Sequence, residues 1–246
     1  MNVLIDAFVW LNDPLNWTLP GGILDRLGEH LFISGLALLL GCALAWPVGA
    51  WLGHTGRGGS AVVMVANLTR ALPTMALLIV LSASFAGIGS EPVILALAVF
   101  AVPPLLANAY VGLRQTDPEV REAARGMGMS SAQVLWRVEL PLAVPYFASG
   151  FRTAAVQVVA TASLAVFVAG GGLGTIVAEG IGLGLQAHAG QVLAGGLLIA
   201  ALAMLVEGLL ALLERAVTPP HIRRTVRRAA RGRAAADPTV GAPGIG

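Results

Sequence analysis

The polar side chains that could act on a partner are concentrated in one stretch of this chain, residues 116–141. Long apolar runs flank the stretch on both sides, whereas the stretch itself carries acidic residues and arginines. The sequence contains no HExxH motif, no cluster of His and Asp, and no Ser-His-Asp arrangement, so no catalytic residue and no metal site is predicted. A polar stretch between two long apolar runs must instead do its work in water.

A first helix of this stretch is predicted from its capping residues. Asp117 is a good N-cap, because its carboxylate can accept the free N–H groups of the first turn. Pro118 follows at the position where a missing N–H costs nothing. The helix is predicted to run to about Met127, with Gly128 in the left-handed conformation that commonly ends a helix.

A second short helix is predicted to start at Ser130. Ser130 and Gln133 have the spacing of a capping box, in which each side chain satisfies a backbone N–H of the other residue. This helix is predicted to end before Pro141, because the residue before a proline resists the α conformation. The stretch is therefore expected to be two short helices joined by a turn, on the water side of a membrane.

The same stretch resembles the cytoplasmic EAA loop of ATP-binding-cassette importer permeases. The matching pattern is EAA at residues 122–124, a glycine at 128, and VELP at residues 138–141, with Val138 where isoleucine is commonest. In that family the loop forms a coupling helix, which docks into a groove on a separate ATPase subunit. The resemblance assigns this coupling role to Glu122, Ala123, Ala124, Gly128, Leu140 and Pro141. Arg121 and Arg125 lie four residues apart, and could meet acidic groups on the ATPase or form a solvated face.

Other segments resemble the osmoprotectant branch of these permeases more narrowly. They are RALPTMAL at residues 70–77, PPLLANAYVGL at 103–113, GFRTA at 150–154 and GGGLG at 170–174. The likeness covers about residues 29–219 and departs at Ala107, where the family often has arginine. It implies a permease for glycine betaine, carnitine, choline or proline. The glycine element is shared with methionine-type importers, so a permease for another small solute, such as methionine-like amino acids, is the alternative.

The resemblance also implies the partners of the chain. A type I importer has two permease subunits, identical or paralogous, around a central path, with two ATPase subunits below and an extracytoplasmic solute-binding protein above. The chain is then expected to be a non-catalytic subunit without a cofactor, because ATP is bound by the ATPase subunits. The composition agrees, since the chain has no lysine and both a P-loop and a Schiff-base site require one. Nucleic acid is not an expected partner.

The elements that must hold the loop are membrane-spanning helices. Of the 246 residues, 57% are hydrophobic and 11% are charged, far below the quarter of charged residues in soluble domains, and the mean hydropathy is +0.81. The chain is therefore predicted to be an all-α, polytopic membrane protein, to which the resemblance adds the type I importer permease fold. Five spans of sufficient length are predicted at about residues 31–52, 61–88, 92–113, 147–168 and 191–213. The predicted domains are an external segment 1–28, a permease domain 29–218 with a cytoplasmic coupling loop 114–146, and a disordered basic tail 219–246.

The arginines predict the orientation in the lipid bilayer of a bacterial inner membrane. With five spans the two ends of the chain lie on opposite sides. Of the 15 basic residues, Arg70 and Arg152 fall in or beside spans and Arg26 alone falls on the side of the N-terminus, while the others fall on the side of the coupling loop and the tail. The positive-inside rule therefore predicts the N-terminus outside and the C-terminus in the cytoplasm.

Polar residues and glycines in or beside the spans are candidates for the translocation path or its gate. They are Arg70, Pro73, Asn108, Tyr110, Gly171 and Gly172. A charge within a span usually faces a cavity or a partner, but Arg70 lies at the surface if the second span starts near residue 71. Asn108 and Tyr110 could instead pack between helices. Arg152 is expected to reach the cytoplasmic surface, and Glu207 is expected to form a hydrogen bond or to pair with an arginine that the sequence does not identify.

A self-contained secondary transporter or a channel is the alternative from another class. Such a carrier is expected to show paired inverted repeats and coupling acids near the middle of the membrane. The sequence has no convincing internal repeat, and Glu207 is its single candidate acid. A permease driven by a separate ATPase is therefore the preferred hypothesis.

Overall fold

The computed structural model describes residues 2–71, 73–83, 89–168 and 170–217, and of residues 68–71 the backbone alone. Within that part of the chain every regular element is helical, so the predicted all-α class is confirmed. The elements before the coupling loop are α1 (Val3–Asn12), α2 (Pro14–Thr18), α3 (Ile23–Thr55), α4 (Gly59–Ala71), α5 (Thr74–Leu81) and α6 (Ser90–Arg114). Those that follow are α7 (Pro118–Gly126), α8 (Ser131–Val134), the π-helical η2 (Leu135–Glu139), α9 (Leu140–Thr161), the 3-10 helix η3 (Ala162–Val168), α10 (Gly174–Gly182) and α11 (Ala189–Val217).

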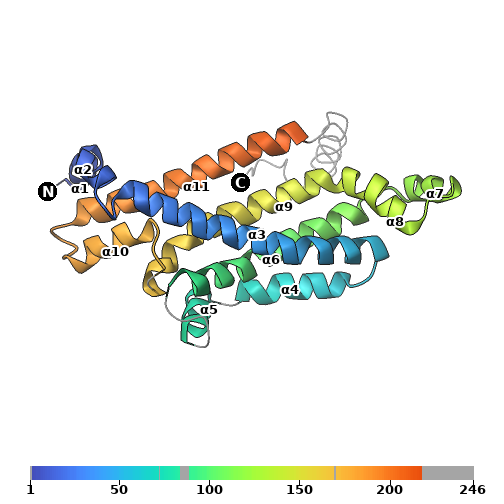
Figure 1. Cartoon of the computed structure of the whole chain (residues 1–246), viewed down its shortest axis with the longest axis horizontal. Helices are drawn as coiled ribbons and strands as arrows, with labels where there is room; N and C mark the ends of the chain where they lie inside the picture. Colours follow the sequence, from blue (N-terminus) through green and yellow to red (C-terminus); the bar gives the residue numbers. More distant parts are fainter. Residues whose placement is uncertain (1, 72, 84–88, 169, 218–246) are drawn as a thin grey trace, which may run out of the picture.

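The long helices run side by side along the longest axis of the molecule (Figure 1). α3, α6 and α11 run from the end that carries α1 and α2 toward the end that carries α7, whereas α4 and α9 run in the opposite direction. α5 and α10 lie toward the end of α1 and α2, and α8 lies beside α7. The predicted coupling loop is thus at the opposite end of the bundle from the N-terminal segment.

Four helical stretches of the described chain are long and apolar enough to span a membrane. They are Pro14–Thr55, Ser90–Arg114, Ser131–Val168 and Ala189–Val217. The predicted spans 31–52, 92–113, 147–168 and 191–213 each lie within one of these stretches. The polytopic organisation predicted from the sequence is therefore present in the structure.

The second predicted span, 61–88, is two short helices rather than one. α4 ends at Ala71 and α5 begins at Thr74, with Pro73 before it in an extended conformation (φ −65°, ψ 121°). A proline lacks the backbone N–H donor that a continuous helix needs, which disfavours a helix running through Pro73. The interval predicted to contain the second span therefore includes a helix break, and residues 72 and 84–88 lie outside the described residues.

The first membrane helix begins earlier than predicted. α3 starts at Ile23, so the predicted boundary at residue 28 between an external segment and the permease domain falls inside the helix. Asp25 stabilises this start in two ways. Its charge lies in the first turn, where the helix dipole favours an anion, and its carboxylate accepts the N–H of Gly21 at 2.9 Å.

Small residues allow α3 to pack closely on α6. They recur every four residues on one face of α3 and are all buried: Ala37, Gly41, Ala45, Gly49 and Gly53. A Cβ added at Gly49 would lie 2.7 Å from the Cβ of Ala109, and the glycines before and after it on this face approach α6 in the same way. Glycine and alanine at four-residue intervals are typical of membrane helices whose backbones lie close together.

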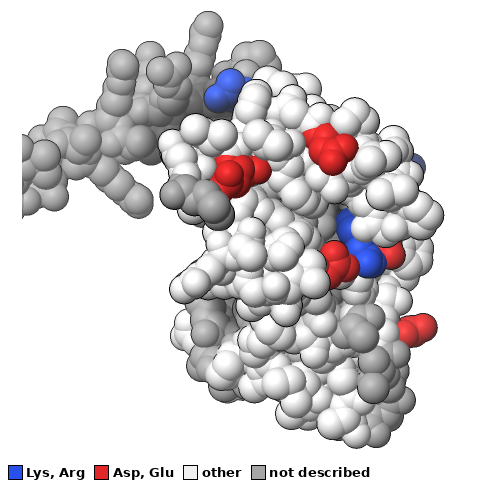
Figure 2. All heavy atoms as spheres, turned by 90° about the vertical axis from the view of Figure 1, so that its left-hand side faces the viewer, with Lys and Arg blue, Asp and Glu red and all other residues white. Residues whose placement is uncertain are grey.

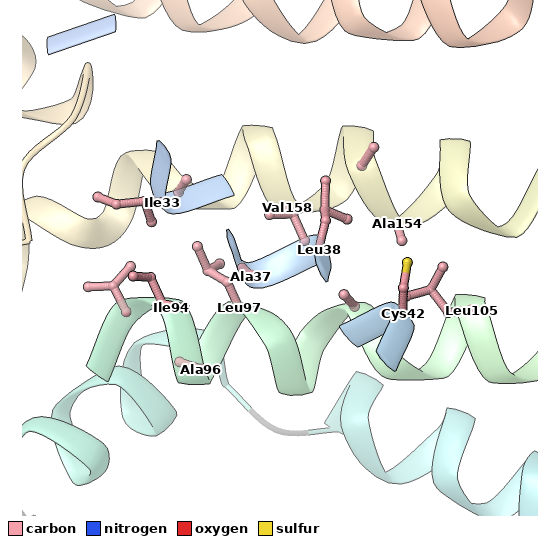
Figure 3. Close-up of a cluster of buried hydrophobic side chains, with 14 of the residues drawn as sticks. Ile33, Ala37, Leu38, Cys42, Ile94, Ala96, Leu97, Leu105, Ala154 and Val158 are labelled. Atoms are coloured by element: carbon pink, nitrogen blue, oxygen red, sulfur yellow. The ribbon is translucent and has the colours of Figure 1, made fainter. Parts of the chain in front are cut away.

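The core lies where α9 joins this pair of helices. Figure 3 shows side chains of α3, α6 and α9 pointing toward one another, among them Ile33, Ala37, Leu38, Cys42, Ile94, Ala96, Leu97, Leu105, Ala154 and Val158. α9 packs on α6 through two further glycines. A Cβ on Gly150 would lie 2.6 Å from the Cβ of Asn108, and one on Gly112 would lie 2.7 Å from the Cβ of Tyr146. The coupling-loop ends of α3, α6 and α9 are therefore held at fixed distances from one another.

The glycine turn before α10 is fastened to the start of α3. The N–H of Gly172 donates to Glu29 Oε2 at 2.8 Å, and the N–H of Leu173 donates to His30 Nδ1 at 3.3 Å. Because Nδ1 accepts, Nε2 carries the proton and donates to the carbonyl oxygen of Val159 at 2.9 Å. The buried imidazole of His30 thereby joins α3, α9 and the turn.

The end of the molecule that carries α1 has few basic groups (Figure 2). Arg26 lies between two carboxylates there, 3.1 Å from Glu29 and 3.5 Å from Glu179 of α10. α1 packs on the start of α11, where Gly190 lies so close to Asp6 that an added Cβ would be 2.7 Å from its backbone. The opposite face of α1 is apolar and exposed at Leu4, Ile5, Phe8 and Val9.

Candidate functional site

Helix α7 has the two ends that the sequence predicts. The Asp117 carboxylate accepts the N–H of Glu119 at 2.9 Å, and Pro118 is the first residue of the helix. α7 ends at Gly126, and Gly128 has φ 83°, in the left-handed region. No neighbouring atom of the described chain lies within 4 Å of a Cβ placed on Gly128, so glycine is required there by the backbone conformation and not by lack of space. The predicted first helix and its glycine turn are confirmed.

The second helix begins as predicted but does not end where predicted. Ser130 and Gln133 form the capping box, with N–H to side-chain oxygen distances of 3.3 Å and 2.8 Å. α8 then continues through η2 into α9, and Pro141 lies in the first turn of α9. In η2 the N–H of Leu140 bonds to the carbonyl of Leu135, five residues back, and this wider turn accommodates the missing N–H of the proline. The coupling loop is therefore continuous with the span that ends at residue 168.

The residues of the EAA pattern divide between the surface and the interior of the chain. Glu122, Ala123 and Arg125 are exposed on α7, whereas Ala124 is buried. Ala124 therefore packs within this chain. The other three side chains remain available to a partner.

Three large apolar side chains that were not predicted as site residues also lie on the surface of this loop. Met127 and Trp136 are 77% and 70% exposed, and Val120 is also exposed. Exposed large apolar side chains in a stretch that must face water are candidates for contact with a partner. These residues could have been identified in the sequence by their apolar character within a stretch that must face water.

Arg121 points into the chain. Its Nε donates to Glu139 Oε1 at 2.5 Å, and its Nη2 donates to the carbonyl oxygen of Leu113 at 2.5 Å. The Arg121 side chain is only 15% exposed, which excludes a solvated face for this residue. Arg125 is the arginine of the pair that α7 presents to the outside.

Glu139 is the buried centre of an ionic cluster at the coupling-loop end of the bundle. Its side chain is 1% exposed, and its second oxygen, Oε2, lies 2.5 Å from His54 Nδ1 at the end of α3. His54 Nε2 lies 2.7 Å from Ser131 Oγ at the start of α8. We call Glu139, Arg121, His54 and Ser131, with the carbonyl of Leu113, the Glu139 cluster. The cluster cannot be recognised in the sequence, because His54 and Glu139 are 85 residues apart and no local pattern joins them.

A cavity of about 180 Å³ lies beside Asn108 within the membrane part of the molecule. It is lined by Ala66, Phe100, Pro103, Pro104, Ala107, Asn108, Thr153 and Gln157. The side-chain amide of Asn108 donates to the carbonyl of Pro104 at 2.8 Å, while its Cβ packs on Gly150. Asn108 therefore both packs between α6 and α9 and borders a cavity.

The other described candidates for the path are not among the residues that line this cavity. The Tyr110 hydroxyl lies against the first residue of α4, where an added Cβ would be 2.7 Å away. Pro73 is the N-cap residue of α5, and the side chain of Arg70 lies outside the described residues. Gly171 and Gly172 have φ 80° and 86° and lie on the start of α3, at the opposite end of the bundle from α7.

Arg152 pairs with two acidic residues of α11. Its Nε donates to Glu207 at 2.8 Å and its Nη1 donates to Glu214 at 2.8 Å. The Arg152 side chain is 35% exposed, and the two carboxylates direct it along α11. Arg152 is therefore the arginine that pairs with Glu207, which the sequence left unidentified. A second cavity, of about 600 Å³, borders this pair and shares Thr153 and Gln157 with the first.

Comparisons with known proteins agree with this architecture. The sequence profile of the family described as "Binding-protein-dependent transport system inner membrane component" matches residues 37–219. The chain is 35% identical over 203 residues to the glycine betaine/carnitine/choline transport system permease protein OpuCB of Bacillus subtilis, covering 82% of this chain and 92% of the relative. It is 31% identical over 199 residues to the osmoprotectant import permease protein OsmW of Salmonella typhimurium, covering 79% of this chain and 91% of that relative.

A solved structure of the inward-facing MetNI methionine ABC transporter has the same fold. The match has a TM-score of 0.71 at 24% identity and covers 85% of this chain and 100% of that chain. The importer permease fold that the sequence predicts is therefore confirmed.

Proposed function

Because this chain belongs to the family of binding-protein-dependent transport system inner membrane components, we propose that it is the permease subunit of an ATP-driven osmoprotectant importer. The observation that carries the proposal is α7, a capped, glycine-closed helix at one end of the bundle (Figure 1). α7 leads through α8 and η2 into the span that ends at residue 168. A helix held in this way can seat in a groove of a separate ATPase subunit and pass its movement to the membrane helices.

The proposed coupling surface combines apolar anchors with charges. Met127 and Trp136 enter the groove of the ATPase, because large exposed apolar side chains contribute most to such contacts. Glu122 and Arg125 meet charged groups at the rim, and Ala123 lets α7 approach closely. The remaining residues of the EAA pattern determine the shape of the loop: Ala124, Gly128, Leu140 and Pro141.

The proposed assembly contains two ATPase subunits, a second permease subunit and an extracytoplasmic solute-binding protein. This chain performs no catalysis in the assembly, since ATP is bound and hydrolysed by the ATPase subunits. In the bacterial inner membrane, α7 and the C-terminal tail face the cytoplasm and the N-terminus faces outward. The arginines of residues 114–137 and of the tail support this orientation.

The proposed substrates are small osmoprotectants such as glycine betaine, carnitine, choline or proline. The names of the relatives support this class, since OpuCB is a glycine betaine/carnitine/choline permease and OsmW an osmoprotectant permease. The cavity beside Asn108 is proposed to form part of the path, because its amide and hydroxyl groups suit a polar solute. Arg70 and Pro73, the latter between α4 and α5, and Tyr110, Gly171 and Gly172 outside this cavity, are proposed as further path or gate residues.

The test compares two glycines of the same turn in the complete importer, reconstituted in lipid vesicles with its binding protein. Gly128→Ala forces a side chain into a left-handed conformation at a cost of about 1–2 kcal/mol, which should reorient α7 and lower ATP-driven uptake of radiolabelled glycine betaine roughly tenfold. Gly126→Ala is the matched control, since Gly126 is helical and has no described atom within 4 Å of an added Cβ. Equal uptake by the two variants contradicts the coupling role.

Two further outcomes decide between this proposal and its alternatives. Uptake by the chain without ATPase subunits and nucleotide would favour a secondary transporter or a channel. Uptake of methionine in place of glycine betaine would favour a permease for another small solute.

A further inference from the structure

We propose that Glu139 is a positioning residue, which locks the coupling helix α7 to the ends of α3, α6 and α9 so that these helices move as one body. This inference deepens the coupling function proposed above and rests on it. Coupling requires that a displacement of α7 reach the membrane helices. The buried carboxylate of Glu139 makes the contacts that can transmit this displacement.

Apolar packing alone holds α7 weakly. α7 has nine residues, lies at the very end of the bundle, and has Ala124 as its one buried residue (Figure 1). A single buried methyl group can neither fix the rotation of a helix nor resist a pull along it. A directional contact is therefore needed if α7 is to transmit force.

Arg121 supplies that contact from α7. Its guanidinium reaches Glu139 Oε1 and the carbonyl of Leu113 with different nitrogens, each at 2.5 Å. The planar fork of arginine fixes the directions of both bonds at once. One side chain thereby joins α7 to the last turn of α6 and to η2.

Glu139 continues the connection with its second oxygen. Oε2 lies 2.5 Å from His54 Nδ1 in the last turn of α3, and His54 Nε2 lies 2.7 Å from Ser131 Oγ at the start of α8. A buried carboxylate is costly unless both oxygens are paired, and here both are. Since a buried, fully paired cluster tolerates little displacement, it holds α3, α6, α7 and α8 in one arrangement.

The position of Glu139 in the sequence adds the link to α9. Glu139 is the last residue of η2 and α9 begins at the next residue. A displacement of α7 therefore reaches the membrane helix α9 through the cluster and not only along the chain. It bypasses the turn at Gly128, which would otherwise act as a hinge.

The test uses variants that break the cluster and one that does not. Glu139→Gln and Arg121→Met each remove one partner of the ion pair. Arg121→Lys keeps the charge, and therefore the fold, but a single ammonium group cannot hold both Glu139 and the Leu113 carbonyl. Arg137→Met is the matched control, because Arg137 lies on the same η2, is exposed, and forms no ion pair with the described residues.

The first measurement is the distance between spin labels on α3 and α7 in the full-length chain in lipid nanodiscs. The labels replace the exposed Thr55 and Glu119, in a Cys42→Ala background that removes the single native cysteine. The parent and Arg137→Met are expected to give one narrow distance distribution. The three cluster variants are expected to broaden it.

The second measurement is uptake and ATP hydrolysis in the complete importer. In the cluster variants the solute moved per ATP is expected to fall about fivefold or more. The double variant Arg121→Met/Glu139→Met is expected to lose no more than either single variant, because residues that act as one unit are not additive. A merely structural role would lower uptake and hydrolysis in proportion.

A narrow distance distribution in Arg121→Lys overturns the proposal, whereas a broadened distribution with an unchanged ratio of uptake to hydrolysis supports the positioning role and contradicts the coupling function. The distance measurement needs neither nucleotide nor ATPase. It therefore decides whether Glu139 positions α7 even if the coupling function itself proves wrong.

Discussion

At the scale of single residues, His30 shows how one polar side chain fixes an otherwise apolar assembly. It is fully buried, and its two ring nitrogens are engaged by groups from distant parts of the chain. Val159 O is among the last carbonyls of α9, and the Leu173 N–H belongs to the turn before α10. Both groups need a partner, because a helix end and a turn leave backbone groups without one.

We predict that His30→Leu destabilises the protein without altering its surface. The variant leaves the N–H of Leu173 and the carbonyl of Val159 buried and unpaired. At about 1–3 kcal/mol for each of the two groups, the free energy of unfolding should fall by about 2–6 kcal/mol. Thermal unfolding in detergent measures this loss, with the exposed Phe32→Leu on the same helix as control. Equal melting temperatures for the two variants would show that the buried histidine is dispensable.

At the scale of elements, the contact between α3 and α6 depends on small residues. Substitutions at two glycines of α3 can distinguish the effect of close packing on stability from the effect of helix propensity. We predict that Gly49→Ala lowers the unfolding free energy by about 1–3 kcal/mol, because the new Cβ meets Ala109 at 2.7 Å and the carbonyl of Leu106 at 2.9 Å. Gly35→Ala, in the same helix, has no described atom within 4 Å and should gain up to about 1 kcal/mol from helix propensity. Melting temperatures that shift in the same direction would contradict the close packing.

Elements were predictable from the sequence where their causes are local. Asp117, Gly128 and the Ser130–Gln133 box act within a few residues, and the structure has them as predicted. The helix end that was predicted before Pro141 is absent from the structure, because the π turn of η2 lets the helix continue through the proline. The π turn contains the buried Glu139, which pairs with Arg121 of α7. Contacts with other helices therefore outweighed the local tendency of a helix to end before a proline.

At the scale of the whole molecule, the sequence could indicate the spans but not which side chains meet across them. Apolar length places four of the five predicted spans in long helices, since burial in a bilayer depends on composition alone. The pairing of Arg152 with Glu207, of His54 with Glu139, and the cavity beside Asn108 depend on how helices rotate against one another. That rotation is set by contacts such as those of Gly49 and Gly150, which only the folded chain reveals.

Orientation is the whole-molecule property on which coupling depends, and it can be tested directly. Single cysteines at Asn12 and Glu119, both exposed, report the two ends of the bundle in a Cys42→Ala background. Because arginines crowd the end that carries α7, we predict that a membrane-impermeant maleimide labels Asn12→Cys in intact spheroplasts and labels Glu119→Cys only after permeabilisation. A cytoplasmic ATPase can reach α7 only in that arrangement. Labelling of Glu119→Cys from outside would therefore contradict the proposed coupling function, whatever the relatives of this chain transport.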